Sequence, residues 1–163
     1  MAHLPEAERR QFIRLRSQPL IAGKGLCDIA PDIVNSLCGP SASAEARAAL
    51  TESLLRLHPG SYVKSVQATV DFDGRLIPSL IGCPTLVVVG EFDSLTPLSE
   101  AKEISSQIAG SHLVVIPDAG HLSNIEQPES FNREVLNFLL GVIKDRYKTV
   151  LPSVIAAHRL PDS

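Results

Sequence analysis

The chain has few aromatic residues, little net charge and no long apolar run, and each absence excludes a class of function. Aromatic residues make up 4% of its 163 residues and tryptophan is absent, so stacking surfaces for nucleic acid bases are missing. The formal net charge of −3 provides no attraction to nucleic acid or to an anionic membrane. Its apolar runs are of strand length, well below the roughly 20 residues that cross a bilayer. We therefore expect neither nucleic acid nor membrane as a partner.

Cysteine is also scarce, and its pattern favours a reducing compartment. Cys27, Cys38 and Cys83 lack the spacing of a metal site, and an odd number argues against a disulfide framework. Reduced thiols in a cytoplasmic protein are the simplest interpretation. The opening residues, MAHLPEAERRQF, contain no apolar stretch typical of a secretory signal. With 44% hydrophobic and 20% charged residues, the composition is that of one globular domain or a piece of one.

Residues 1–80 are expected to be mostly helical. Pro31 can open a short helix, because the first turn of a helix needs no N–H donor at that position. Ser43 is a suitable N-cap for a helix over residues 44–57. The Pro-Gly pair that follows ends this helix, and Ser61 is expected to cap the next one.

Residues 81–146 show a different pattern, in which strands and helices alternate. Residues 86–89 and 113–116 are continuous apolar runs, which indicate strands covered on both faces, as in a parallel sheet. An amphipathic helix between them should stop at Gly110, and a last helix should open at Pro128. The order strand, helix, strand, helix predicts an α/β fold whose two strands are parallel through a right-handed crossover.

The remaining residues, 147–163, form a tail of mixed composition. Pro152 and Pro161 are helix breakers, and we expect the end of the tail to be poorly ordered. The chain is thus divided into a helical region, an α/β region and a tail.

Two polar residues follow the predicted strands, and together they suggest hydrolytic chemistry. Asp93 lies four residues past Val89, and His121 lies five residues past Ile116. Functional groups collect at the carboxyl ends of parallel strands, so the two side chains should meet. Histidine is the natural general base near neutral pH, and a carboxylate bound to its Nδ1–H holds the ring in the required tautomer. Gly120 would let the backbone turn sharply before the histidine.

Other acids and histidines are weaker candidates. An isolated aspartate in a loop usually forms a turn, and an isolated histidine is usually structural. Asp118 is the main rival acid, but it lies on the same loop as His121, so a neighbouring strand is better placed to hold the orienting carboxylate. Asp71 and Asp73 precede the first strand by more than ten residues. The remaining histidines are assigned to surface positions: His3, His58, His112 and His158.

The sequence around Asp93 and His121 resembles that of a known superfamily. Residues 81–140 look like the C-terminal end of α/β-hydrolases. The sequence PTLVVVGEFDSLTP resembles the segment that carries the triad acid, and VVIPDAGHLSNIEQPESF resembles the segment that carries the triad histidine. GHLSNIEQPE is similar to 3-oxoadipate enol-lactonases, and residues 5–75 resemble the helical cap of such enzymes. The resemblance implies that Asp93 is the triad acid and His121 the general base. It also implies a carboxylic ester or lactone as substrate, and no cofactor or metal.

The nucleophile of that superfamily is not visible in this chain. It normally lies in G-x-S-x-G on a strand-to-helix turn, and the nearest text, GPSAS at residues 39–43, lacks the second glycine and a preceding strand. Ser41 is better interpreted as a loop residue or a helix cap, and an oxyanion loop of the HG type is also absent. The resemblance therefore covers a cap and the last two strands of the core, which is a partial α/β-hydrolase fold.

A partial fold has consequences for stability and activity. An isolated pair of parallel strands is marginal, and an unpaired strand edge is an association site. We expect the chain alone to be inactive and to fold poorly, to associate with itself, or to bind a partner chain that supplies the missing sheet. A non-catalytic binding module derived from a hydrolase is the alternative, and a nucleophile outside the chain could be Ser, Cys or Asp. Arg14 and Arg16 are expected to be solvated helix charges rather than substrate ligands.

Overall fold

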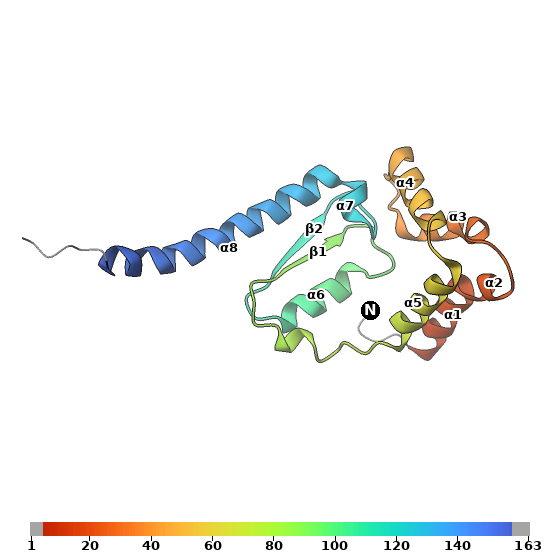
Figure 1. The fold of residues 1–163 in the computed structure, drawn as a ribbon, viewed down its shortest axis with the longest axis horizontal. Coiled ribbons are helices and arrows are strands. Elements are labelled where there is room, and N and C mark those ends of the chain that lie inside the picture. The colour runs from red at the N-terminus through yellow and green to blue at the C-terminus, as the bar shows by residue number, and fades with distance from the viewer. Residues whose placement is uncertain (1–4, 158–163) are drawn as a thin grey trace, which may run out of the picture.

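A computed structural model describes the backbone of residues 5–157 and the side chains as far as residue 144. The helical region lies at one end, the two-stranded sheet in the middle, and the last helix runs away from both (Figure 1). In chain order the elements are α1 (Glu6–Arg16), α2 (Gln18–Ile21), α3 (Leu26–Leu37), α4 (Ala44–Leu55), α5 (Pro59–Asp71), the 3-10 helix η1 (Pro78–Leu80), β1 (Leu86–Gly90), α6 (Leu98–Gln107), β2 (His112–Ile116), α7 (Ser123–Glu126) and α8 (Pro128–Ala157).

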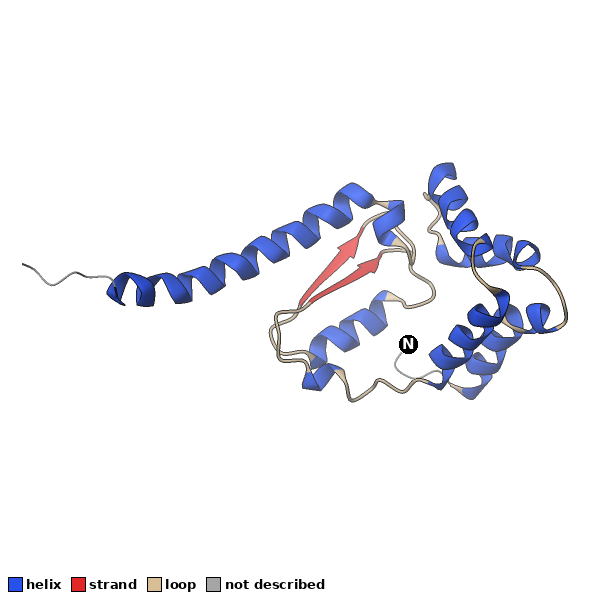
Figure 2. Cartoon of the chain, in the orientation of Figure 1, coloured by secondary structure: helices blue, strands red, loops and turns tan. Residues whose placement is uncertain are grey.

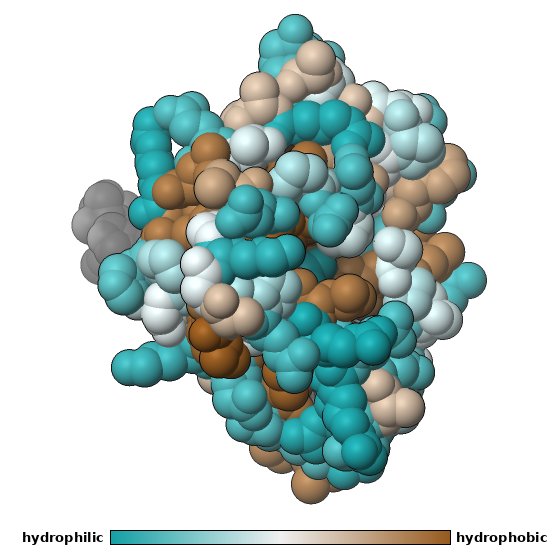
Figure 3. Space-filling model, turned by 90° about the vertical axis from the view of Figure 1, so that its right-hand side faces the viewer, coloured by the Kyte–Doolittle hydropathy of each residue, from teal (hydrophilic) through white to brown (hydrophobic). Residues whose placement is uncertain are grey.

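The helical region has its own apolar core between α3 and α4. Its members recur at helical spacing, which places them on facing sides of the two helices. The outer face of this end mixes hydrophilic residues with apolar ones that lie deeper between them (Figure 3). The buried core residues are Leu26, Ile29, Ala30, Ile33, Val34, Leu50 and Leu54.

The start of α3 differs from the sequence prediction. Pro31 does not open a helix but lies inside one that begins at Leu26. The carboxylate of Asp28 accepts a hydrogen bond of 2.7 Å from the N–H of Gly25, and this contact caps the earlier start. The carbonyl that Pro31 leaves without a helical donor belongs to Cys27, which is exposed, so water can solvate it.

The caps of the next two helices differ in how well the sequence predicts them. Ser43 caps α4, since its hydroxyl accepts a hydrogen bond of 3.1 Å from the N–H of Ala46. Ser61 does not cap α5, which begins at Pro59. Instead the Nδ1 atom of His58 accepts the N–H of Ser61 at 3.3 Å. Proline at the first position moves the cap to the residue before it.

The sheet has the predicted parallel arrangement. β1 pairs with β2 in a register that joins Leu86 to His112 and Gly90 to Ile116. α6 provides the crossover and lies on one face, while α8 lies on the other. Both strand arrows point towards α7 and the helical region (Figure 2). The carboxyl ends of the strands therefore meet the helical region, where the candidate residues lie.

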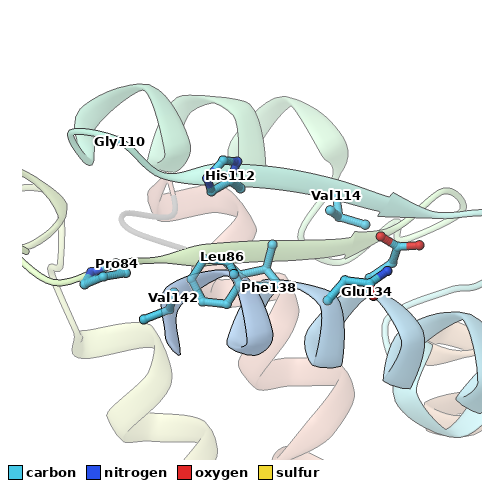
Figure 4. Close-up of a pocket in the computed structure, with 10 residues that line it drawn as sticks. Pro84, Leu86, Gly110, His112, Val114, Glu134, Phe138 and Val142 are labelled. Atoms are coloured by element: carbon cyan, nitrogen blue, oxygen red, sulfur yellow. The ribbon is translucent and has the colours of Figure 1, made fainter. Parts of the chain in front are cut away.

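The strands are less completely covered than their sequences predict. Leu86, Val87 and Val88 are only half-buried, and Val115 is exposed. An open cleft of roughly 750 Å³ separates the sheet from α8, with His112 and Phe138 edge to face across it (Figure 4). Two strands and two helices do not supply enough surface to enclose both faces of the sheet.

The last helix is longer than expected. α8 begins at Pro128 as predicted, but it continues to Ala157 and includes Pro152. The tail expected from residue 147 is therefore helical over most of its length, and its final residues, 158–163, lie outside the described part of the chain.

Candidate active site

Asp93 is held by a tight turn directly after β1. Its backbone N–H donates to the carbonyl of Gly90 at 3.2 Å. Its Oδ1 atom accepts hydrogen bonds of 2.9 Å from the N–H groups of Leu95 and Thr96. This is the way in which aspartate side chains stabilise turns, so the carboxylate shapes the loop that carries it.

His121 is delivered by the loop after β2, which needs an unusual backbone. Asp118 has a φ of 57°, and it is the only residue other than glycine with positive φ in the described part of the chain. A Cβ atom on Gly120 would lie 2.6 Å from the carbonyl oxygen of Leu37, so no other residue fits there. The N–H of His121 then donates to that same carbonyl at 2.8 Å. The helical region thus fixes the backbone of the histidine.

The two side chains meet above the carboxyl ends of the strands. The Nδ1 atom of His121 lies 2.9 Å from Oδ2 of Asp93. Since a carboxylate only accepts, Nδ1 carries the proton and donates it. The hydroxyl of Thr96 donates to the same oxygen at 2.7 Å. The side chain of Asp93 is 4% exposed and that of His121 31%, so the acid is buried while the imidazole reaches the surface.

The environment of Asp93 keeps it ionised. Burial by itself would raise the pKa of this carboxyl group, because a charge is poorly solvated inside a protein. The hydrogen bonds from the N–H and hydroxyl of Thr96 act in the other direction, followed by the hydrogen bond from His121 and its electrostatic attraction. The pKa of Asp93 lies below its ordinary value as a result.

This geometry suits proton transfer. With its proton on Nδ1, His121 presents the lone pair of Nε2 for accepting a proton, and the nearby carboxylate stabilises the imidazolium that forms. No side chain that the structure describes forms a hydrogen bond with Nε2. The pair is therefore open to a nucleophile or a water molecule on that side.

The rival acids have other partners. The backbone N–H of Asp118 donates to Glu91 at 3.1 Å, and the carboxylate that bonds His121 is that of Asp93. Asp71 pairs with Arg9 in the helical region. Asp73 pairs with Arg75, two positions further along the chain. Of the histidines assigned to the surface, His58 and His112 are exposed as expected, while positions 3 and 158 lie outside the described residues.

Sequence reasoning missed two residues of the site, Thr96 and Glu126. Thr96 lies three positions after Asp93, where hydroxyl residues commonly join an aspartate turn, and this spacing could have identified it. Glu126 is buried beside His121 and bonds three backbone N–H groups. Glu126 belongs to the sequence GHLSNIEQPE, but nothing in that local pattern indicates which backbone N–H groups it binds.

A cleft lies beside the loop that carries Asp93. It measures roughly 590 Å³ and lies between α1, α3 and residues 94–95. Arg16 lines it and is half-buried, with its guanidinium 4.8 Å from the ring centre of Phe12 and 2.9 Å from the hydroxyl of Ser36. Arg14 is exposed, and the half-buried Arg16 makes its bond to Ser36 at an exposed position, which is compatible with the expectation of solvated helix charges.

The described residues contain neither a metal-binding cluster nor a membrane-spanning helix. No group of three or more His, Cys, Asp or Glu residues among them could hold a metal ion. No described helix combines the length and the apolar character needed to cross a bilayer.

Comparisons with known proteins agree on one superfamily. The family model of TAP-like proteins matches residues 65–148, just over half of the chain. The 2-hydroxy-6-oxononadienedioate/2-hydroxy-6-oxononatrienedioate hydrolase of Klebsiella pneumoniae subsp. pneumoniae is 40% identical over 88 residues, which are 52% of this chain and 30% of that protein.

Solved structures match over most of the chain. A thermophilic esterase from Thermogutta terrifontis is 27% identical with a TM-score of 0.76, over 86% of this chain and 52% of the esterase. The enol-lactonase from Burkholderia xenovorans LB400 is 22% identical with a TM-score of 0.68, over 85% of this chain and 53% of the lactonase, and this likeness concerns the fold alone. The chain spans about half of these two proteins, and its match to the hydrolase from Klebsiella is shorter still. The family match and the shared fold show that the chain belongs to the α/β-hydrolase superfamily, in the family of TAP-like proteins.

Proposed function

We propose that the chain supplies the acid and the base of a hydrolase site that cleaves a carboxylic ester or a lactone. The observation that carries the proposal is the bond of 2.9 Å between Nδ1 of His121 and Oδ2 of the buried Asp93. The esterase, which is 27% identical, supports an ester substrate, and the similarity of GHLSNIEQPE to enol-lactonases extends the proposal to lactones. The substrate named for the Klebsiella relative is an oxo dicarboxylate and neither an ester nor a lactone, so that relative supports hydrolysis in general and not this class of bond.

The proposed reaction begins with a nucleophile outside this sequence. Nε2 of His121 accepts the proton of a serine hydroxyl as its oxygen attacks the carbonyl carbon of the substrate. The histidine then returns the proton to the alkoxide, which leaves as an alcohol from an ester or becomes the free hydroxyl of the opened ring from a lactone. Water adds to the acyl group in the same way, which releases the acid and restores the serine. Asp93 keeps the imidazole in the required tautomer throughout.

The test requires a polypeptide that includes the nucleophile. The coding sequence upstream of Met1 is read first, for a strand followed by G-x-S-x-G in the same frame. The longer polypeptide is then assayed with short p-nitrophenyl esters, with His121→Ala and a variant of the exposed His112, His112→Ala, as its control. We expect His121→Ala to lower kcat by about 10³-fold or more and His112→Ala to leave it unchanged. Equal activity of all three proteins would contradict the proposal.

We also infer that the apolar surface around the sheet binds the remaining strands of a hydrolase core. The esterase has about twice the length covered by this chain, and the edges of a two-stranded sheet have unpaired backbone groups. Large apolar residues that are half or more exposed occur on α8, before η1 and within it. They include Leu136, Leu140, Ile143, Leu76 and Leu80.

This inference predicts the behaviour of the purified chain. We expect self-association in size-exclusion chromatography with light scattering, together with binding of a dye that reports exposed apolar surface. A monomer that binds no dye would contradict it. A folded monomer without esterase activity would instead favour a binding module, for which the cleft beside Arg16 in the helical region is a candidate site.

A further inference from the structure

Glu126 is a buried carboxylate at the end of α7, and it is 8% exposed. Its Oε2 atom accepts hydrogen bonds from the N–H of Gly39 at 2.7 Å and from the N–H of Gly120 at 3.1 Å. Its Oε1 atom accepts the N–H of Leu122 at 3.3 Å. One side chain thus satisfies three backbone donors from two parts of the chain.

These donors surround His121. Gly120 and Leu122 are its immediate neighbours, so the carboxylate holds the backbone on both sides of the histidine. The N–H of His121 itself donates to Leu37 at 2.8 Å. The backbone N–H groups of residues 120–122 are therefore all bonded. Glu126 accepts the first and the third, and the carbonyl of Leu37 accepts that of His121.

The bond to Gly39 shows that the Glu126 carboxylate does more than cap a local helix. Gly39 lies 87 positions from Glu126, two residues past the end of α3 in the helical region. A Cβ atom on Gly39 would lie 2.8 Å from the nitrogen of Gly120, so the two backbones touch where both residues are glycine. The guanidinium of Arg47 donates to the carbonyl of Gly39 at 3.1 Å and holds the segment from its other side.

The chemistry of the position also calls for an explanation. A buried carboxylate is costly unless it is fully hydrogen-bonded. No ion pair to Glu126 occurs among the described residues, and its stabilisation comes from N–H groups instead. An arrangement that gathers three donors around one charge specifies a single loop conformation more strictly than apolar packing would.

From these contacts we propose that Glu126 is a positioning residue, which holds His121 against Asp93 and ties it to residues 37–39 of the helical region. The proposal rests on the proposed function in one respect, the role of His121 as the base. The geometry of the imidazole can be measured without any turnover, so the two proposals are tested separately.

The test compares Glu126→Gln with Glu129→Gln in the full chain by NMR. Glu129 is exposed in the first turn of α8, so its variant removes the same charge from a neighbouring solvent-facing position. In Glu126→Gln the amide NH₂ faces N–H donors, and at least one of the three bonds is lost. We expect the amide protons of Gly39, Gly120 and Leu122 to exchange about tenfold faster or more. Glu129→Gln should exchange like the parent.

A second readout separates positioning from mere stability. The proton on Nδ1 of His121 gives a downfield resonance while it is bound to Asp93, and ¹⁵N shifts of the ring report the tautomer. We expect Glu126→Gln to shift and broaden this resonance at a temperature where circular dichroism shows an intact fold. If Glu126→Gln does not fold, Glu126→Asp, which keeps the charge on a shorter side chain, is measured in the same way. Unchanged amide exchange, or faster exchange with an unchanged imidazole resonance, would overturn the proposal.

Discussion

Replacing Asp93 by asparagine or by alanine separates two tasks of this carboxylate. Oδ1 holds the turn through the N–H groups of Leu95 and Thr96, and Oδ2 holds His121 and the hydroxyl of Thr96. Asparagine keeps an oxygen in the first position and places an NH₂ group in the second. Alanine removes both.

The contacts set the size of each effect. Alanine loses four hydrogen bonds at about 1 kcal/mol each, and partial rehydration of the freed donors reduces the total, so we expect a loss of about 3 kcal/mol. Asparagine retains the turn and loses mainly the contribution of the charge, which we expect to cost about 1 kcal/mol. Its NH₂ group also donates to Nδ1 of His121, which moves the ring proton to Nε2 and removes the lone pair from the open side.

Two measurements check this reasoning. Urea unfolding followed by circular dichroism gives the free energy of unfolding of the parent and both variants, and ¹⁵N shifts of the imidazole give the tautomer. If Asp93→Ala is unfolded without urea, Asp93→Asn alone carries the comparison with the parent. An asparagine variant as unstable as the alanine variant would refute the assignment of separate tasks. A proton that stays on Nδ1 in Asp93→Asn would refute the assignment of Oδ2 to the histidine.

Three further predictions follow from the same structure. The pKa of Asp93 is below its ordinary 3.8, so its stabilising contribution should be complete above that value and disappear as the pH falls through the lower folded pKa. Urea midpoints measured across the acid range should fall more steeply for the parent than for Asp93→Asn. Gly120→Ala should destabilise the chain by about 2 kcal/mol through overlap with Leu37, whereas Gly141→Ala, at an open position of α8, should be neutral or stabilising by about 0.5 kcal/mol. Equal unfolding curves for these two variants would contradict the close contact at Gly120. Ile116→Ala should cost about 3 kcal/mol in thermal or urea unfolding, because Ile116 is the one described large side chain that is completely buried, and a cost under about 1 kcal/mol would show that the site is solvent-filled.

Local patterns were sufficient for most elements and for the loops that carry the candidate pair. The apolar runs predict both strands, because the burial of a strand is visible in its own run of side chains. They also placed Asp93 and His121 at the ends of parallel strands. The same reasoning failed at Pro31 and Ser61, where Asp28 and the ring of His58 compete as caps and shift the helix starts.

The sequence by itself therefore determined the order of elements, the parallel sheet and the two residues most suited to acid and base chemistry. The sequence also favoured Asp93 over Asp118 as the partner of His121, and the bond of 2.9 Å between Asp93 and His121 agrees with this. Only the tertiary structure decided which residues hold the pair. Asp93 prevails over Asp118 because the register of the strands brings it to the imidazole. Glu126 meets Gly39 only when the helical region packs on the histidine loop. Such contacts join segments distant in the chain, and no periodicity in either segment encodes them.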